Sequence, residues 1–244
     1  MLFSLGLAQP GRAEKLLGIE GDQDQRVTQE ARIWPFAAIG RFNSEAGSYC
    51  SGALIGPKLV LTAGHCLWDK HLHAPPPAHM LHFVAGWDRG SYVAHARAAS
   101  YVISPGFSGA RPYSAEEAGR DWALVVLEEP IGEQTGWFGV EPAAEARSTV
   151  TLAGYGQDRA QVPAAHQGCH LGPRMIGALM LHDCDAVKGD SGSPLYDAAT
   201  FRIRAVHVAA LQTPQGVAGG AVPTASFLAA ARALGAGTAA KIKR

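Results

Sequence analysis

Short apolar runs separated by Gly and Pro constrain the fold of this chain more than any other feature. The 244 residues include 29 glycines and 15 prolines, which are spread along the sequence instead of being gathered in one linker. Both residue types interrupt regular structure, so the runs between them have room for strands but rarely for long helices. The pattern therefore predicts an all-β architecture of many short strands, in a barrel or a sandwich.

The two ends of the chain differ from this pattern. We interpret residues 1–21 as a signal remnant, a pro-segment or an N-terminal arm, because residues 1–8 are similar to the end of a signal-peptide apolar region. Residues 226–234 have the one good helix pattern, with Ser226 as a suitable N-cap. The tail at 236–244 is basic and is expected to end in a frayed terminus.

Charge and cysteine content narrow the range of partners and compartments. Lys and Arg number 21 and are balanced by 21 Asp and Glu, which argues against nucleic acid or an anionic membrane as a partner. No apolar run approaches the ~18 residues of a spanning helix. The cysteines form two close pairs, Cys50 with Cys66 and Cys169 with Cys184. Two local disulfides would indicate a secreted or periplasmic protein, and four buried free thiols are the alternative.

The segment Gly189–Pro194 has the sequence Gly-Asp-Ser-Gly-Ser-Pro and places Ser191 in a glycine-rich turn. Glycine allows backbone angles and close approaches that other residues resist. Such a turn can expose a serine hydroxyl and aim backbone N–H groups at one point, as an oxyanion hole requires. A glycine-rich surface turn is the alternative interpretation.

A nucleophilic serine needs a base, and the base needs a group that orients it. His65 follows an apolar strand pattern, and Asp121 precedes another one. With Ser191, they occur in the order His, Asp, Ser, which among serine hydrolases is the chain order of the chymotrypsin triad. Each residue also has a structural interpretation, with His65 as a core histidine and Asp121 as a cap at the start of a strand.

Three blocks of the sequence resemble the chymotrypsin-fold, trypsin-like serine endopeptidases. They are Thr-Ala-Gly-His-Cys at 62–66, Asp-Trp-Ala-Leu at 121–124 and the segment Gly189–Pro194, and the likeness extends over residues 22–235. The bacterial branch that includes the glutamyl endopeptidases is the most similar. This resemblance implies two antiparallel six-stranded β-barrels that meet at about 130–148, with the site between them, a polypeptide substrate and no cofactor.

The resemblance also implies a role for each residue of the site. Ser191 would attack the substrate, His65 would take and return its proton, and Asp121 would orient the histidine. The backbone N–H groups of Gly189 and Ser191 would form the oxyanion hole. Among the disulfides, the resemblance supports the one beside His65, whereas the pair at 169 and 184 would close the loop before the nucleophile.

Specificity is predicted less sharply, because two residues compete for the primary pocket. Asp185 lies six residues before Ser191, where trypsins carry the acid that binds Arg or Lys. His207 resembles the strand histidine with which glutamyl endopeptidases bind a substrate carboxylate. Cleavage after basic residues, after glutamate or after small or apolar residues therefore all stay open, and His207 as a simple core residue is a fourth interpretation.

Asp190 leads to a separate hypothesis about activation. In trypsin-like zymogens, the acid before the nucleophile binds a newly cut N-terminal amine. By this resemblance, we expect cleavage by an activating protease within residues 12–21, at Lys15-Leu16 or Gly18-Ile19, with the new amine bound to Asp190. A locally hydrogen-bonded Asp190 is the alternative.

Other functions remain as rivals at this point. The chain could be an inactive protease homologue that serves as a binding module, or an esterase on the same fold. The cleft could also bind an inhibitor without turnover. The histidines around the Pro75–Pro77 loop have no acid or cysteine grouped with them, so we expect no metal site there.

Overall fold

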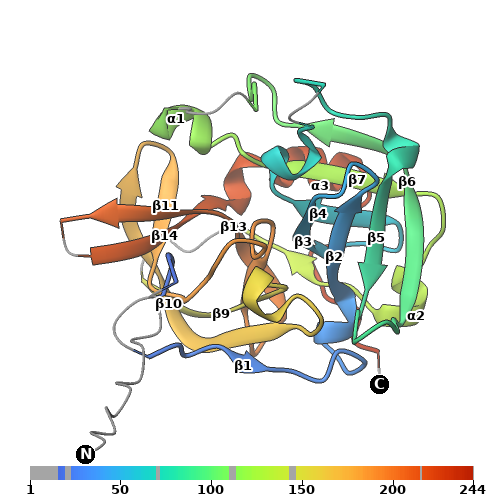
Figure 1. Ribbon diagram of the computed structural model, residues 1–244, viewed down its shortest axis with the longest axis horizontal. Coiled ribbons are helices and arrows are strands. Elements are labelled where there is room, and N and C mark those ends of the chain that lie inside the picture. Colours follow the sequence, from blue (N-terminus) through green and yellow to red (C-terminus); the bar gives the residue numbers. More distant parts are fainter. Residues whose placement is uncertain are drawn as a thin grey trace, which may run out of the picture.

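Strands dominate the chain, and they close into two barrels (Figure 1). The computed structural model describes residues 16–19, 23–69, 72–109, 114–142, 147–214 and 216–243. Most of the predicted signal remnant or pro-segment lies outside these ranges. The prediction of two antiparallel six-stranded barrels is confirmed.

The first barrel contains the strands nearer the N-terminus. Its members are β2 (Ile39–Ser44), β3 (Tyr49–Leu54), β4 (Leu59–Thr62), β5 (Leu81–Ala85), β6 (Ala94–Ile103) and β7 (Ala123–Leu127). They pair in the order β2-β3-β4-β7-β6-β5, and β5 returns to β2 to close the ring. Phe42, Leu61 and Phe83 are completely buried in its interior. The first half of β6 alternates buried and exposed residues, as a strand with one face on a core must.

The second barrel follows the same principle. Its members are β9 (Ser148–Gly154), β10 (Ala164–Ile176), β11 (Leu179–His182), β12 (Pro194–Asp197), β13 (Arg202–Thr213) and β14 (Gly216–Pro223). They pair in the order β9-β10-β11-β14-β13-β12, and β12 returns to β9. Two short strands extend this sheet: β1 (Val27–Thr28) pairs with β10, and β8 (Gly139–Val140) runs parallel to β13. The nucleophile turn, residues 189–193, leads into β12.

Helices are short throughout the described ranges. The α-helices are α1 (Ala115–Ala118), α2 (Gly132–Thr135) and α3 (Leu228–Ala233). The 3-10 turns are η1 (Phe36–Ala38), η2 (Gly64–Leu67), η3 (Ala78–Met80), η4 (Gln157–Arg159) and η5 (Thr224–Ser226). None of the described helices is long and apolar enough to cross a membrane.

The predicted C-terminal helix is present, but its start differs from the prediction. Ser226 belongs to η5, and the helix α3 begins only after Phe227, whose N–H binds the Thr224 carbonyl. The assignment of Ser226 as N-cap is therefore wrong, because an additional 3-10 turn precedes the helix. Gly235 follows the helix with φ of 93°, in the left-handed region that favours glycine.

The C-terminal tail packs on the segment that joins the two barrels. Trp137 and Lys241 exchange backbone hydrogen bonds of 3.1 and 2.9 Å, and the Val140 N–H donates to the Gly237 carbonyl. The Lys241 ammonium lies 4.6 Å from the centre of a Trp137 ring, within the range of a cation–π contact. The expectation of a frayed end is wrong at Lys241, because backbone pairing holds this residue.

Candidate active site

His65 and Asp121 are brought together by two neighbouring strands of the first barrel. β4 and β7 are antiparallel, so the end of β4 at Thr62 lies beside the start of β7 at Ala123. His65 follows β4 in η2, and the fully buried Asp121 precedes β7. One Asp121 oxygen accepts the backbone N–H of His65 at 2.8 Å, and the other lies 2.7 Å from its Nδ1. Because a carboxylate accepts, Nδ1 carries the proton and Nε2 keeps a lone pair.

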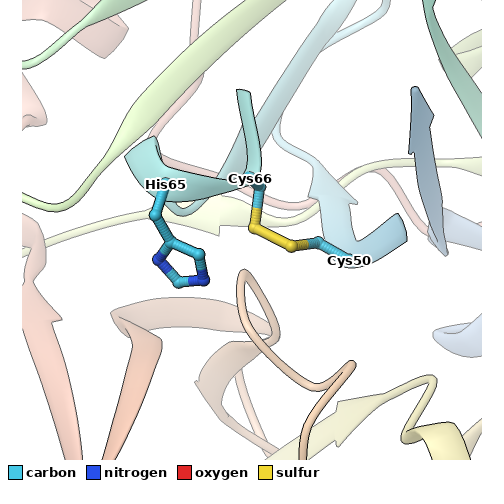
Figure 2. A group of neighbouring side chains, drawn as sticks. All are labelled: Cys50, His65 and Cys66. Carbon is cyan, nitrogen blue, oxygen red and sulfur yellow. A yellow bond between two sulfur atoms is a disulfide. The ribbon is translucent and has the colours of Figure 1, made fainter. Parts of the chain in front are cut away.

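The disulfide between Cys50 and Cys66 fixes the position of this histidine. Figure 2 shows His65 next to the bond that joins β3 to η2. The Cα atoms of the two cysteines are 5.9 Å apart. The second disulfide joins Cys169 to Cys184. The cluster of Cys50, His65 and Cys66 is not suited to a metal ion, because oxidised cysteines have no thiolate to offer.

Ser191 lies in a turn that packs directly against the first barrel. Gly192 has φ of 86°, and a Cβ atom at this position would lie 2.1 Å from the Ser51 carbonyl oxygen and 2.3 Å from Thr62 Oγ1. Only glycine permits this approach. Since Thr62 is three residues before His65, the contact brings the nucleophile turn to the end of the strand that leads to His65.

Ser51 holds the nucleophile turn on two sides, and it was not predicted from the sequence. Its N–H donates to the Ser191 carbonyl at 2.8 Å, and its hydroxyl donates to the Gly189 carbonyl at 2.9 Å. The same hydroxyl accepts the Tyr155 N–H at 2.8 Å. Ser51 is completely buried. The available signal was a polar residue beside Cys50 in an otherwise buried strand.

The backbone N–H groups of Gly189 and Ser191 both have fixed orientations. The Lys188 carbonyl accepts the first N–H of η4 at 2.7 Å, and the Asp190 carbonyl accepts the Ser193 N–H at 2.9 Å. In a trans peptide, the C=O and the following N–H point in opposite directions. The N–H groups of residues 189 and 191 therefore point away from these two contacts. Within the described residues, neither of them donates to a protein acceptor.

Asp185 is buried, and its carboxylate already accepts a hydrogen bond from the N-terminal arm. Its Oδ2 accepts the Gln25 N–H at 2.7 Å and lies 3.8 Å from His166 Nδ1. The backbone N–H of Asp185 donates to the same Nδ1 at 2.9 Å. These contacts tie Asp185 to groups of this chain instead of leaving it as an open anionic site.

His207 lies in β13, and its backbone is bonded to the nucleophile turn. Its carbonyl accepts the Gly192 N–H at 2.8 Å, and its N–H donates to the Ser193 carbonyl at 2.9 Å. His182, which was not predicted from the sequence, lies behind it, with Nε2 3.0 Å from His207 Nδ1. His182 Nδ1 accepts the Cys184 N–H, so its proton resides on Nε2 and is donated to His207. His207 must then carry its own proton on Nε2.

Burial keeps both of these histidines uncharged. Loss of solvation lowers the pKa of His207 to about 3 and the pKa of His182 well below its usual value. The structure thus contains a pair of neutral imidazoles whose hydrogen bonds run in one direction, from Cys184 through His182 to His207.

Asp190 has a partner other than the one hypothesised from the sequence. Its Oδ2 accepts the Val187 N–H at 2.9 Å and lies 3.3 Å from Nη1 of Arg26. Burial raises the pKa of Asp190 to about 6, although the Val187 N–H and Arg26 favour the charged form. In the uncut chain, the carboxylate is therefore paired with an internal guanidinium.

The segment expected to be cut is described only in part. Residues 12–15, 20 and 21 lie outside the described ranges, and so does one side of the Lys15-Leu16 bond. Gly18 and Ile19 are buried, and the Gly18 carbonyl accepts the Ala186 N–H at 3.1 Å. Cleavage at Gly18-Ile19 would require this contact to open first.

Two six-stranded barrels with an Asp–His pair beside a serine turn define the chymotrypsin-like class of folds. The family model described as trypsin matches residues 24–231, so the chain belongs to the trypsin family. A solved structure described as a Glu endopeptidase in complex with MPD has a TM-score of 0.74 and 23% sequence identity. The structural alignment covers 89% of this chain and 99% of the solved one, and it supports the chymotrypsin-like fold.

Two known proteases are similar to this chain in sequence. Glutamyl endopeptidase of Bacillus licheniformis is 29% identical over 201 residues, which are 75% of this chain and 55% of that protein. A trypsin-like protease of Streptomyces glaucescens is 28% identical over 170 residues, which are 60% of this chain and 58% of that protein. The aligned part thus spans less than two thirds of the length of each of these relatives.

Proposed function

We propose that this chain is a serine endopeptidase that forms an acyl-enzyme on Ser191. One observation carries this proposal: Asp121 fixes the tautomer of His65, and the Ser191 turn packs against the strand that leads to the same histidine. Family membership and the protease names of the relatives support it. The two disulfides suit a secreted or periplasmic protein.

The proposed reaction uses His65 as base and then as acid. Ser191 Oγ attacks the peptide carbonyl while its proton moves to Nε2 of His65, and Asp121 stabilises the imidazolium that forms. The proton next passes to the leaving amine, and the C–N bond breaks to give the acyl-enzyme. Water then attacks the ester with His65 as base again, which releases the acid and restores Ser191.

The tetrahedral intermediates need donors for their negative oxygen. We assign this role to the N–H groups of Gly189 and Ser191, because each belongs to a peptide whose carbonyl is already held on the opposite side. A donor that is oriented before the reaction does not have to reorganise as charge develops, and each is worth about 2.7–4 kcal/mol in comparable sites.

For specificity, we propose that the primary pocket accepts a glutamate side chain. His207 carries its proton on Nε2 and stays neutral, so it can donate to a carboxylate without the cost of a buried unpaired cation. Asp185, the candidate for basic substrates, is engaged by Gln25. The names of the Bacillus relative and of the solved structure agree with this choice.

Cleavage-site profiling on a peptide library tests the proposal. We expect cleavage after Glu in the wild type, loss of this preference in His207→Ala, and its retention in Asp185→Ala. His182→Ala should weaken Glu selectivity in the same direction, because His207 would lose the donor that sets its tautomer. Cleavage after Arg or Lys that disappears in Asp185→Ala would refute the glutamate assignment while leaving the peptidase assignment intact.

The rivals can be separated by a second comparison. A binding module would leave both peptides and simple esters uncut, and an esterase would turn over only the esters. We expect hydrolysis of both substrate types, with both lost in Ser191→Ala. Binding of this variant to an uncut peptide would show that the cleft is still folded.

A further inference from the structure

The guanidinium of Arg26 is surrounded by three carboxylates. Its Nε and one Nη2 hydrogen donate to the two oxygens of Asp24 at 3.0 and 2.9 Å. Nη1 and Nη2 donate to the two oxygens of Asp158 at 3.2 and 2.7 Å. The remaining Nη1 hydrogen is directed to Asp190 at 3.3 Å. All five N–H groups of the guanidinium therefore have a carboxylate oxygen as acceptor.

Burial makes this arrangement obligatory for the folded chain. The side chains of Arg26 and Asp190 are only 1% and 2% exposed. Arginine cannot release its proton in a protein, so a buried guanidinium must be paired. Arg159 lies at the outer side of the cluster, where it bonds to Asp24 and to the Arg26 carbonyl. Two guanidinium groups thus face three carboxylates.

The cluster ends in the turn that carries the reaction. Asp190 lies between Gly189 and Ser191, the two residues assigned to the oxyanion hole. Its Oδ2 accepts the Val187 N–H, so the side chain folds back onto its own turn. Arg26, which comes from the N-terminal segment, contacts the same oxygen. Close approach is built into the fold, because a Cβ at Gly156 would lie 2.7 Å from Arg26 Nη1.

We propose that Arg26 is the positioning residue that holds the oxyanion turn in its working arrangement, so that the turn is formed in the uncut chain. The inference rests on the proposed function of Ser191. It follows from the identity of the cation: the partner of Asp190 is a side chain within the domain, and the expected cut site at Gly18 and Ile19 is itself buried. A new N-terminal amine is therefore not needed to neutralise Asp190.

Intact-mass spectrometry after reaction with an organophosphonate tests the central point. The mass of each adduct shows both whether Ser191 is labelled and whether the same chain has been cut. We expect adducts on chains that are uncut within residues 12–21, formed at a rate comparable to that of chains trimmed within this segment. Adducts found only on trimmed chains would overturn the inference and leave the serine endopeptidase proposal intact. No adduct on either form would remove the proposed function and this inference with it.

Substitution of Arg26 tests its role in positioning. Arg26→Met should lower kcat by about 100-fold, as expected for the loss of an oxyanion donor, with a small change in KM. Affinity for a peptide aldehyde, which uses the oxyanion hole, should fall in parallel with kcat. Arg26→Lys should recover part of the rate, because lysine restores the charge but only three donors. Arg32→Met removes an exposed arginine and is the matched control.

A further variant keeps the test informative if Arg26→Met folds poorly. Arg26→Met combined with Asp190→Asn removes both the cation and the most buried of its three carboxylates, while Asp24 and Asp158 keep Arg159 as a partner. The fold should therefore recover while kcat stays low. A folded double variant with wild-type kcat and wild-type aldehyde affinity would overturn the proposed role. Low kcat with unchanged aldehyde affinity would also contradict it, because the oxyanion turn would then be intact.

Discussion

At the scale of single residues, Ser51 connects the two barrels at the point where the reaction is proposed to occur. Its hydroxyl is shared between the Gly189 carbonyl, in the nucleophile turn, and the N–H of Tyr155, the residue that follows β9. Its backbone N–H holds the Ser191 carbonyl. One small side chain thus restrains the turn relative to the strand that starts at Tyr49.

Replacing Ser51 by Ala should therefore affect stability and rate together. The substitution leaves two buried backbone groups without a partner, at about 1–3 kcal/mol each. We expect urea unfolding to show a loss of about 2–6 kcal/mol, and kcat to fall as the Gly189 peptide becomes free to rotate. Ser226→Ala, at an exposed site, is the control and should change neither quantity. Unchanged kcat in a folded Ser51→Ala protein would show that the turn is held by other contacts.

Sequence reasoning identified some of these residues and missed others for a physical reason. His65, Asp121 and Ser191 stand in short blocks whose neighbours carry the signal. Ser51 and Arg26 act through partners that lie far away in the chain, with a separation of 138 residues from Ser51 to Gly189 and 164 from Arg26 to Asp190. His182 pairs with His207 across 25 residues, from a different strand. A local pattern contains no record of such pairs, so only the folded arrangement shows them.

At the scale of elements, the two disulfides provide a matched pair. Their sequence separations are 16 and 15 residues, so loop-closure entropy predicts nearly equal stabilisation, about 3 kcal/mol each. Their surroundings differ. The first lies beside His65, and the second ends at Cys184, whose N–H sets the tautomer of His182.

Removing each disulfide by double Ala substitution should separate stability from function. We expect similar losses in the free energy of unfolding. The Cys50/Cys66 variant should have a lower kcat, because a small displacement of a catalytic group costs up to about 100-fold. The Cys169/Cys184 variant should instead have a raised KM for Glu peptides. Steady-state kinetics and urea titrations measure both effects, and equal kinetic changes in the two variants would contradict this division.

The strand pattern predicted the class of fold well, because short apolar runs between Gly and Pro have room for strands but rarely for long helices. Closure into two barrels came from the family resemblance and not from periodicity. The start of α3 was missed because the η5 turn is stabilised by its own backbone bond, and Ser226 carries no sign of that turn. The backbone pairing of Lys241 was not predicted, because its partner, Trp137, lies far away in the chain, in the segment between the barrels.

At the scale of the whole molecule, buried titratable groups set the pH dependence of stability in opposite directions. His207 has a native pKa of about 3 against an ordinary value of 6.5, and His182 is lowered too, so the unfolded chain binds more protons as the pH falls below 6.5. These two residues reduce stability on acidification. Asp190 has a native pKa of about 6 against 3.8, so the native state binds the extra proton between these values, and stability rises on acidification.

The difference between the wild type and Asp190→Asn isolates the second contribution. Both proteins should lose stability as the pH falls from 6 to 4. The loss should be steeper in Asp190→Asn, by up to about 1.4 kcal/mol per pH unit, because the opposing proton uptake has gone. Urea unfolding in a Ser191→Ala background avoids self-digestion, and Asp88→Asn serves as a surface control with the slope of the wild type. A shallower slope in Asp190→Asn would contradict the raised pKa.

The central claim is that Ser191 is a nucleophile activated by His65. The most direct measurement is peptide mapping of the disulfide-intact protein after reaction with an organophosphonate. We predict one adduct per chain, on the peptide that contains Ser191, with loss of peptide hydrolysis in proportion to labelling and no adduct in Ser191→Ala or His65→Ala. An adduct at another residue, or hydrolysis that persists when Ser191 is fully labelled, would contradict the claim.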